Sequence, residues 1–210
     1  MESSIEKMMR FFKRAFPLDE WRAEMRDGRS RPQIPAGTVA QVVVEMVARG
    51  QRSLLEVDQE ARHPEVRAWF GSRREMVVSD TTLERSLGGF ELSPVREVLW
   101  DIAGGVKERP MMRVKLPSGR WARLGNLDGS GWGGFLGSVL TLVGRSLDIV
   151  AGYRMSPGRG HELETSRAVL RDALEHLGRG FVDLLVVDAL YMTEQDILWA
   201  YEEGGCHLVV

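Results

Sequence analysis

The segment that most constrains the fold of this chain is residues 182–192, which read VDLLVVDALYM. Five of its first six residues are apolar, and the run leads to Asp188. A short apolar run bounded by turn residues is typical of a strand buried on both faces of a parallel or mixed sheet. A carboxylate at the end of such a strand is costly unless it is paired or holds a metal, and ligands collect at that end of open α/β sheets. The segment therefore predicts both a sheet and a candidate site.

The bulk composition excludes several classes of protein. The chain has 210 residues, of which 43% are hydrophobic and 28% charged, as in soluble globular proteins. No apolar run is long enough to span a membrane, and the acidic, interrupted start of the chain is a poor signal peptide. Cys206 is the single cysteine, which excludes a disulfide framework and a cysteine-based zinc site. We therefore expect a cytoplasmic protein with no membrane partner.

The charged residues leave a nucleic-acid partner open. A net charge of −2 excludes a chain coated in positive charge, but it does not exclude a local basic patch. Only four of the 28 basic residues are lysines. Arginine presents a planar fork of donors that suits phosphate, although genomic base composition also explains the bias and is the simpler explanation.

Residues 1–108 have the pattern of a helical N-terminal region. The pattern predicts a helix that Thr38 caps and Gly50 stops, one that starts at Ser53, and one capped by Ser79 or by the aspartate that follows it. A last helix is predicted to end at the glycine pair 104–105. Several short helices beside arginines are compatible with a helix-turn-helix. An ordinary small helical bundle is the alternative, and the pattern alone favours it.

Residues 109–210 predict a different architecture. Three strands with short links are expected to form an antiparallel meander, and a long helix follows over residues 160–177. The strand that ends at Asp188, a helix capped by Thr193 and a final short strand complete the order. The fold class is therefore α+β, a helical domain followed by an incomplete RNase H-like mixed sheet. Because that sheet normally continues with another helix, we expect a truncated chain.

Asp128 and Asp188 are the candidate metal ligands. Each follows an apolar strand, and in this topology the first and fourth strands of the sheet are neighbours. Two ionised carboxylates at close range repel each other unless a divalent ion lies between them. Oxygen ligands favour Mg²⁺ or Mn²⁺, and two such ions ~4 Å apart serve phosphodiester chemistry. The alternatives are a hairpin turn at the Asp-Gly step for Asp128, and a helix cap or salt bridge for Asp188.

Other candidates are weaker. The glycines of the segment GSGWGG resemble a phosphate loop, but they lack its lysine and are interpreted as hairpin residues. His161 and Glu162 open a helix whose N-terminus attracts anions, although surface residues are common there. Three glutamates follow Asp188, and a third ligand among them competes with a simple role at the helix terminus. These are Glu194, Glu202 and Glu203.

Several of these segments resemble one family. The sequence is similar to the DDE transposases of bacterial insertion sequences, of the insertion-sequence-four-like kind, over most of its length. RSRPQIPAGTVAQVVVEMVARGQRSLLEVD and VVSDTTLERSLGGF resemble the helical N-terminal region of that group. LGNLDGSGWGG resembles its first aspartate motif. GRGHELETSRAVLRDAL with LLVVDALYMTEQDILWAYEEGGCHLVV resembles the second motif and the helix before it.

The resemblance implies Asp128 and Asp188 as the first two of three catalytic carboxylates that bind Mg²⁺ or Mn²⁺. The third, a glutamate on a later helix, has no match in this chain. The resemblance also implies duplex DNA as partner, both transposon ends and target, with a homodimer as one assembly open to the chain. It strengthens the helix-turn-helix interpretation and implies that arginines near it contact phosphate. These are Arg52, Arg62, Arg67, Arg73, Arg74 and Arg85.

Three functions therefore remain open. The first is a transposase that hydrolyses phosphodiesters at transposon ends and transfers the strand. The second is a DNA-binding remnant without catalysis. The third, which the residues support least, is a metal-dependent nuclease or phosphohydrolase on the same fold.

Overall fold

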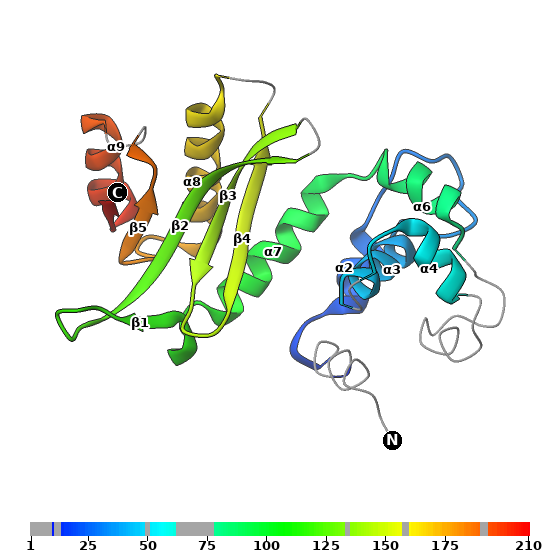
Figure 1. Cartoon of the computed structure of the whole chain (residues 1–210), viewed down its shortest axis with the longest axis horizontal. Coiled ribbons are helices and arrows are strands. Elements are labelled where there is room, and N and C mark those ends of the chain that lie inside the picture. Colours follow the sequence, from blue (N-terminus) through cyan, green and yellow to red (C-terminus); the bar gives the residue numbers. More distant parts are fainter. Residues whose placement is uncertain are drawn as a thin grey trace. The chain divides into compact units, whose positions relative to one another are not determined.

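The computed structural model describes residue 10 and residues 14–48, 51–61, 78–132, 135–156, 160–189 and 193–210 (Figure 1). The chain divides into two compact units, Met1–Val95 and Arg96–Val210. The division falls inside helix α7, Leu92–Val106, and not after residue 108. The fold is α+β, with helices and a mixed sheet of six strands. None of the described helices combines the length and apolar character that crossing a bilayer requires.

Every element described in the first unit before α7 is a helix. Buried side chains of these helices and of the segment before the last of them form a small core, which consists of Val39, Val42, Val57, Val78 and Leu83. The helices are α2 (Leu18–Glu24), α3 (Ala36–Ala48), α4 (Leu54–Ala61) and α6 (Asp80–Leu87).

Helix boundaries follow local hydrogen bonding. Ser79 caps α6, because its side chain accepts the Thr82 amide at 3.2 Å. The cap predicted at Thr38 is wrong: α3 begins two residues earlier, and the carbonyl of Pro35 accepts the Thr38 amide at 3.0 Å. The stop predicted at glycines 104–105 is also wrong, because α7 continues to Val106. Gly104 lies inside α7, and a Cβ there would be 3.8 Å from the Leu177 side chain of α8.

The second unit is built on the mixed sheet. Its central path runs β4-β3-β2-β5-β6, and β1 pairs with β2 outside this path. Strands β2, β3 and β4 are antiparallel, whereas β5 is parallel to β2 and β6 is parallel to β5. The strands are β1 (Arg113–Lys115), β2 (Trp121–Trp132), β3 (Phe135–Val143), β4 (Asp148–Met155), β5 (Leu184–Val187) and β6 (His207–Val209).

Helices connect the parallel strands. A 3-10 turn, Pro110–Met112, precedes β1. Helix α8, Glu162–Leu177, links β4 to β5. Helix α9, Glu194–Trp199, and the π turn that follows it, Ala200–Gly204, link β5 to β6. Thr193 caps α9 as predicted, because its side chain accepts the Asp196 amide at 3.2 Å.

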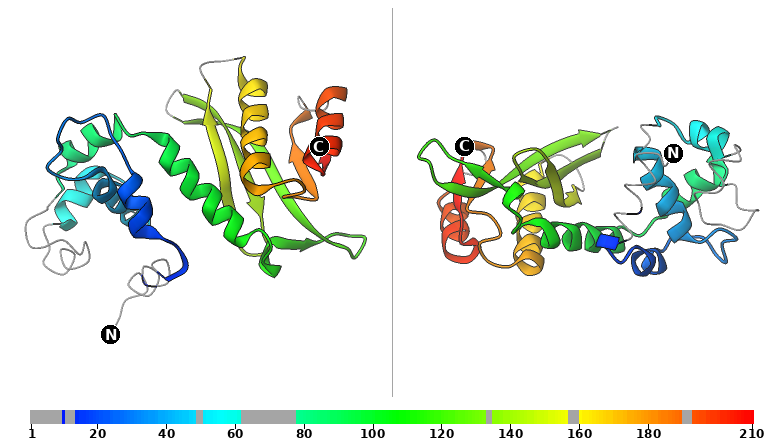
Figure 2. Two further views of the ribbon diagram at one scale, coloured as in Figure 1. Left: turned by 180° about the vertical axis from the view of Figure 1, so that it is seen from behind. Right: turned by 90° about the horizontal axis from the view of Figure 1, so that it is seen from below.

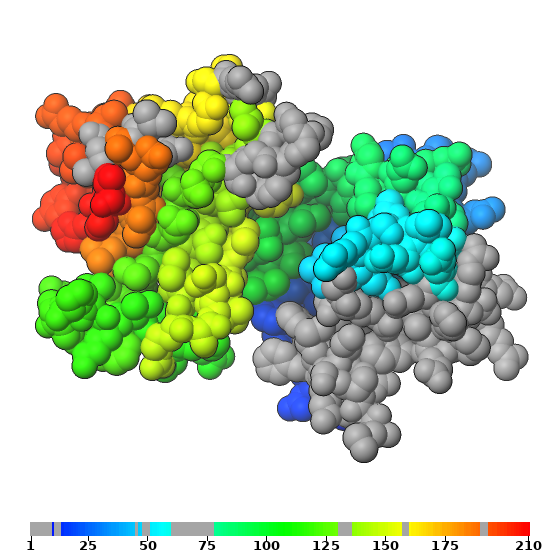
Figure 3. All heavy atoms as spheres, in the orientation of Figure 1, coloured from blue at the N-terminus to red at the C-terminus, as the bar shows by residue number. Residues whose placement is uncertain are grey.

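Helices α7, α8 and α9 lie on one face of this sheet, as the view from below in Figure 2 shows. That face carries the core, which includes Leu127 of β2, Leu140 of β3 and Leu185 of β5, all at most 1% exposed. The opposite face, called the open face below, carries the alternate residues of each strand. Val150 of β4 is 41% exposed there and Val186 of β5 is 38% exposed. Figure 3 shows the open face toward the viewer.

A bulge interrupts the pairing of β3 with β4. Thr141 pairs with Val150, whereas the preceding Leu140 pairs with Gly152, so Ala151 has no opposite residue. Gly152 lies against Trp100 of α7, because a Cβ at this glycine would be 2.2 Å from the indole ring. The bulge therefore turns Gly152 of the edge strand β4 toward Trp100, so that β4 and α7 pack closely.

Candidate metal site

The two candidate aspartates follow paired positions of neighbouring parallel strands. The register of β2 on β5 runs from Leu124 opposite Leu184 to Leu127 opposite Val187. The residue after each member of this last pair is an aspartate: Asp128 follows Leu127, and Asp188 follows Val187. Adjacent strands are about 4.8 Å apart, so the register brings the two aspartates to one edge position. The first and fourth strands of the predicted sheet are thus neighbours, as expected.

Alternation along the strands sets the face on which this acid pair, Asp128 and Asp188, lies. Leu127 and Val187 are buried under the helices. Since successive side chains in a strand point to opposite faces, the next residues belong to the open face. Both aspartates are exposed, in agreement with that position. The acid pair therefore lies on the open face, with Asp128 inside β2 and Asp188 just after the carboxyl end of β5.

The hairpin-turn interpretation of Asp128 is wrong. Asp128 lies inside β2 and pairs with Val139 of β3, and the pairing continues to Trp132 opposite Phe135. Gly129 and Gly131 are strand residues for the same reason, whereas Gly133 and Gly134 lie outside the described residues. The strand extends past the Asp-Gly step because β3 supplies a partner to each residue beyond it. Asp128 is consequently held in the sheet by its pairing with β3.

The described residues supply no third ligand to the acid pair. Within them, no group of three histidine, cysteine, aspartate or glutamate side chains is arranged to hold a metal. Glu194 lies in the first turn of α9, and Glu202 and Glu203 lie in the π turn after it. The fit to a divalent ion therefore rests on two carboxylates, hard oxygen donors, at adjacent positions of neighbouring strands.

His161 and Glu162 make local contacts at the start of α8. The Nδ1 atom of His161 is 3.3 Å from a carboxylate oxygen of Glu164. The carboxylate of Glu162 accepts the Gly160 amide at 2.9 Å. These contacts order the helix terminus, in keeping with the surface interpretation.

Other aspartates of the sheet unit are bound to arginine. Arg123 bridges to Asp183 at 3.2 Å. Burial raises the pKa of the Asp183 carboxyl and hydrogen bonds from Arg123 lower it, with a net lowering. Two further bidentate pairs cross between elements. They are Arg154 with Asp172 and Arg167 with Asp196, each with a contact of 2.7 Å.

The arginines assigned to DNA are only partly described. Arg52 is exposed just before α4, and its backbone amide donates to the Glu56 carboxylate at 2.7 Å. Arg85 is exposed on α6. The segment that joins α4 to α6 lies outside the described residues, so the helix-turn-helix stays a prediction. The same holds for Arg62, Arg67, Arg73 and Arg74.

The register also places two residues that the sequence analysis missed. Tyr153 of β4 pairs with Val139, which in turn pairs with Asp128. Arg96 of α7 acts electrostatically on the Tyr153 hydroxyl. No sequence pattern marks these residues, because their position depends on the bulge in β4.

Comparisons with models of protein families, with curated proteins and with solved structures find no match to this chain.

Proposed function

We propose that this chain carries the first two catalytic carboxylates of a DDE-type DNA transposase. Asp128 and Asp188 would bind Mg²⁺ or Mn²⁺, and the substrate would be a DNA phosphodiester. One observation carries the proposal: β2 and β5 are parallel neighbours, and an aspartate directly follows the last pair of their register, Leu127 with Val187.

The strand order supports an RNase H-like sheet. After the short β1, strands β2, β3 and β4 are antiparallel in succession, and the crossover helix α8 leads to β5, which is parallel to β2. Helix α9 and the π turn then lead to β6, which is parallel to β5 on its outer side. From β2 onward this is the order predicted for the fold, and it brings Asp128 of β2 beside the carboxyl end of β5, where ligands bind in open sheets.

The chemistry of the acid pair explains its need for a cation. Two carboxylates on adjacent strands repel each other when both are ionised, and a divalent ion between them offsets the repulsion. When bound, a pair of such ions activates an attacking oxygen and stabilises a leaving oxygen. The contribution of Asp128 and Asp188 is to hold these charges at fixed positions on strands that cannot move independently. The open face then admits the phosphodiester from solvent.

The helical unit would supply contacts to duplex DNA. Arg52 and Arg85 are exposed, and a guanidinium at such a position neutralises a phosphate without reading the base sequence. In this proposal the first unit binds the DNA end and the second unit acts on it.

A non-catalytic DNA-binding protein is the second candidate function. The observation that favours it is that the described residues place no third carboxylate with the acid pair. Magnesium-dependent nicking of end-containing plasmid DNA by the whole chain, lost in Asp128→Asn, would exclude this candidate. Binding of the same DNA without any cleavage would favour it.

Iron-directed cleavage of the protein tests the metal site independently of catalysis. Fe²⁺ with ascorbate generates radicals beside its own ligands, so the wild-type backbone should be cut near residues 128 and 188. Excess Mg²⁺ should suppress both cuts by competition. The fragments are identified by mass spectrometry.

Matched variants complete that experiment. Asp128→Asn and Asp188→Asn should each abolish both cuts, because the two carboxylates hold the ion together. Asp148→Asn is the control, since Asp148 is also exposed on the sheet but pairs with Val143, far from the acid pair along β3. Cuts that persist in both acid variants would disprove the metal site.

A further inference from the structure

One row of residues crosses the open face from the acid pair to the far edge of the sheet. Asp128 pairs directly with Val139, and Val139 pairs directly with Tyr153. Side chains at directly paired positions lie on the same face. With strands spaced about 4.8 Å apart, the backbone of Tyr153 lies roughly 10 Å from that of Asp128. Tyr153 is therefore the end of a row that begins at the candidate metal site.

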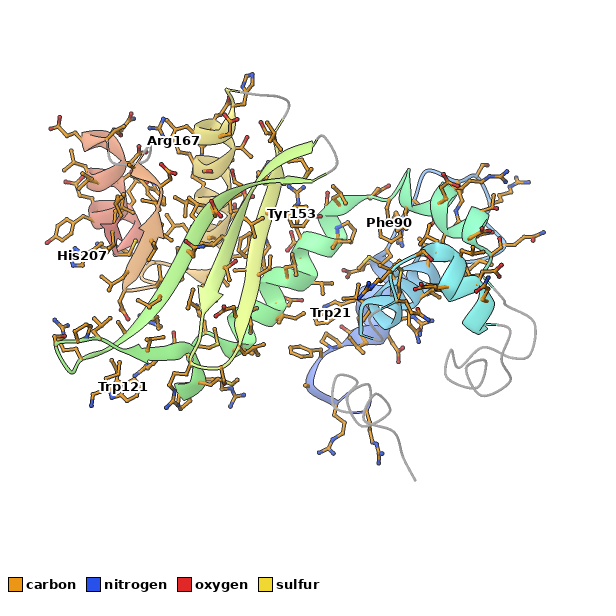
Figure 4. The ribbon with its side chains drawn as sticks, in the orientation of Figure 1. Trp21, Phe90, Trp121, Tyr153, Arg167 and His207 are labelled. Carbon is orange, nitrogen blue, oxygen red and sulfur yellow. The ribbon has the colours of Figure 1, made fainter. Side chains whose placement is uncertain are left out.

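A cation accompanies Tyr153 at this edge. Arg96 lies in α7 one turn before Trp100, and Trp100 packs against Gly152, the residue before the tyrosine. Burial raises the pKa of the Tyr153 hydroxyl, and the nearby Arg96 guanidinium opposes that rise. Figure 4 shows Tyr153 where β4 lies beside α7. The tyrosine hydroxyl and the Arg96 guanidinium can each donate a hydrogen bond and are together called the donor pair below.

The donor pair differs from the other arginine sites of this unit. Arg123, Arg154 and Arg167 each bind an aspartate. Within the described part of the chain, neither the Arg96 guanidinium nor the Tyr153 hydroxyl engages a carboxylate. Both side chains are half-buried at the sheet edge. A preorganised neutral donor beside a cation suits an anionic oxygen.

We infer that the donor pair binds a backbone phosphate of the DNA strand on which the acid pair acts. This inference rests on the proposed function. Phosphates of one strand advance about 3.4 Å per nucleotide along the helix axis, so a span of roughly 10 Å corresponds to about three nucleotides. The ionised acid pair repels phosphate unless cations are bound. A DNA strand that crosses the open face therefore needs hydrogen-bond donors at some distance from the acid pair. Val139 lies between the two groups and offers an apolar contact to a sugar or base.

Salt-dependent DNA binding by the whole chain tests this inference. The probe is a short fluorescein-labelled DNA duplex with a single-stranded overhang, and anisotropy gives Kd between about 50 and 200 mM KCl with Mg²⁺ present. Arg96→Gln should weaken binding several-fold and reduce the slope of log K against log salt by about 0.7 to 0.9, because one phosphate contact is lost. Tyr153→Phe should weaken binding about threefold without a change of slope, because it removes a neutral hydrogen bond and keeps the ring.

Two control variants separate the donor pair from general effects of substitution. Tyr201→Phe alters a tyrosine that is 64% exposed in the π turn after α9. Arg171→Gln alters an exposed arginine of α8, a different helix from the one that carries Arg96. Both should leave Kd and slope unchanged. Circular dichroism of every variant verifies folding.

The outcomes distinguish this inference from the proposed function. If Asp128→Asn removes the magnesium dependence of binding but Arg96→Gln and Tyr153→Phe match their controls, the donor pair is not a DNA contact and the metal proposal stands. If the donor-pair variants weaken binding while Asp128→Asn has no effect on its magnesium dependence, the phosphate contact stands and the metal proposal fails. Equal losses in donor-pair and control variants would overturn the inference.

Discussion

The helical unit and the sheet unit place their aspartates in opposite environments. In the helical unit the side chain of Asp27 is 1% exposed, and it accepts hydrogen bonds from Arg29 at 2.9 and 2.6 Å and from the Ser86 hydroxyl. In the sheet unit Asp128 of β2 and Asp188, just after β5, are exposed. A buried carboxylate is tolerated only when it is paired and hydrogen-bonded. Asp27 therefore stabilises the fold, whereas the acid pair is placed where a ligand from solvent can reach it.

Asp27 connects segments that are distant in sequence. Ser86 belongs to α6, and a backbone bridge joins Asp27 to Phe90 just after that helix. The hydrogen bonds from Arg29 lower the pKa of the Asp27 carboxyl to about 2, against burial, which would raise it. A carboxylate used in this way has no coordination positions left for a metal. The comparison predicts that changes at Asp27 act on stability and changes at the acid pair act on binding.

The largest expected effect is a difference in the free energy of unfolding between variants of two adjacent residues of β2. Leu127→Ala should lower the free energy of unfolding by about 2 to 5 kcal/mol, because Leu127 is 1% exposed in the core. Asp128→Asn should change it by no more than about 0.5 kcal/mol, because the side chain is exposed. Urea unfolding followed by circular dichroism measures both. A large loss in Asp128→Asn would show that this carboxylate is structural, as Asp27 is.

The second effect concerns the pH dependence of the helical unit. The pKa of Asp27 is about 2 in the folded state against 3.8 for an unperturbed aspartate, so ionised Asp27 stabilises the fold above pH 3.8, and the stabilisation is lost as pH falls through 2. The shift corresponds to about 2 kcal/mol. Asp27→Asn should therefore be destabilised by about that amount at neutral pH and little at pH near 2.

Asp80→Asn provides the control for that measurement, since Asp80 also belongs to the helical unit but is half-buried, and its carboxylate accepts hydrogen bonds from the adjacent Thr81. Unfolding of both variants is followed in urea at neutral and acidic pH. A loss in Asp27→Asn that is independent of pH would contradict the ionic origin of the stabilisation.

The smallest expected effect concerns the contribution of the helical unit to DNA binding. Arg85→Gln should leave the free energy of unfolding within about 0.5 kcal/mol of wild type, because the side chain is exposed on α6. It should reduce the salt slope of duplex binding by about 1, as expected for one phosphate contact. Arg145→Gln is the control, because Arg145 is exposed in the sheet unit, where its guanidinium lies 5.3 Å from the Trp121 ring. Equal salt slopes for Arg85→Gln and Arg145→Gln would show that Arg85 makes no phosphate contact.

The sequence predicted the strands of the site better than its helix ends. The apolar run before Asp188 indicates a strand because its burial pattern depends on local composition, and β5 lies there. The Asp-Gly step at Asp128 indicates a turn, but pairing with β3 overrides that local preference. Gly104 indicates a stop, but helix α7 continues through it and packs near Leu177 of α8. Tertiary contacts of this kind have no signature in a short window of sequence.

The donor pair shows a further limit of prediction from sequence. Arg96 and Tyr153 are distant in the chain, and only the strand register connects Tyr153 with Asp128. A one-residue shift of register moves every side chain to the other face. The alternation of residues along β4, taken without the pairing to β3, does not determine on which face of the sheet Tyr153 lies.

The unpaired position of Ala151 in β4 determines on which face Tyr153 lies. Because this residue has no opposite residue in β3, the phase of alternation changes between Val150 and Gly152. If Ala151 instead paired with Leu140, Gly152 would pair with Val139 and Tyr153 with Ser138, so Tyr153 would turn toward the helices and Gly152 would no longer meet Trp100. Deletion of Ala151 would remove the bulge but leave Leu140 opposite Gly152 and Val139 opposite Tyr153. The fold therefore depends on Ala151 being left out of the pairing, because this alone keeps Gly152 against Trp100 and Tyr153 on the open face.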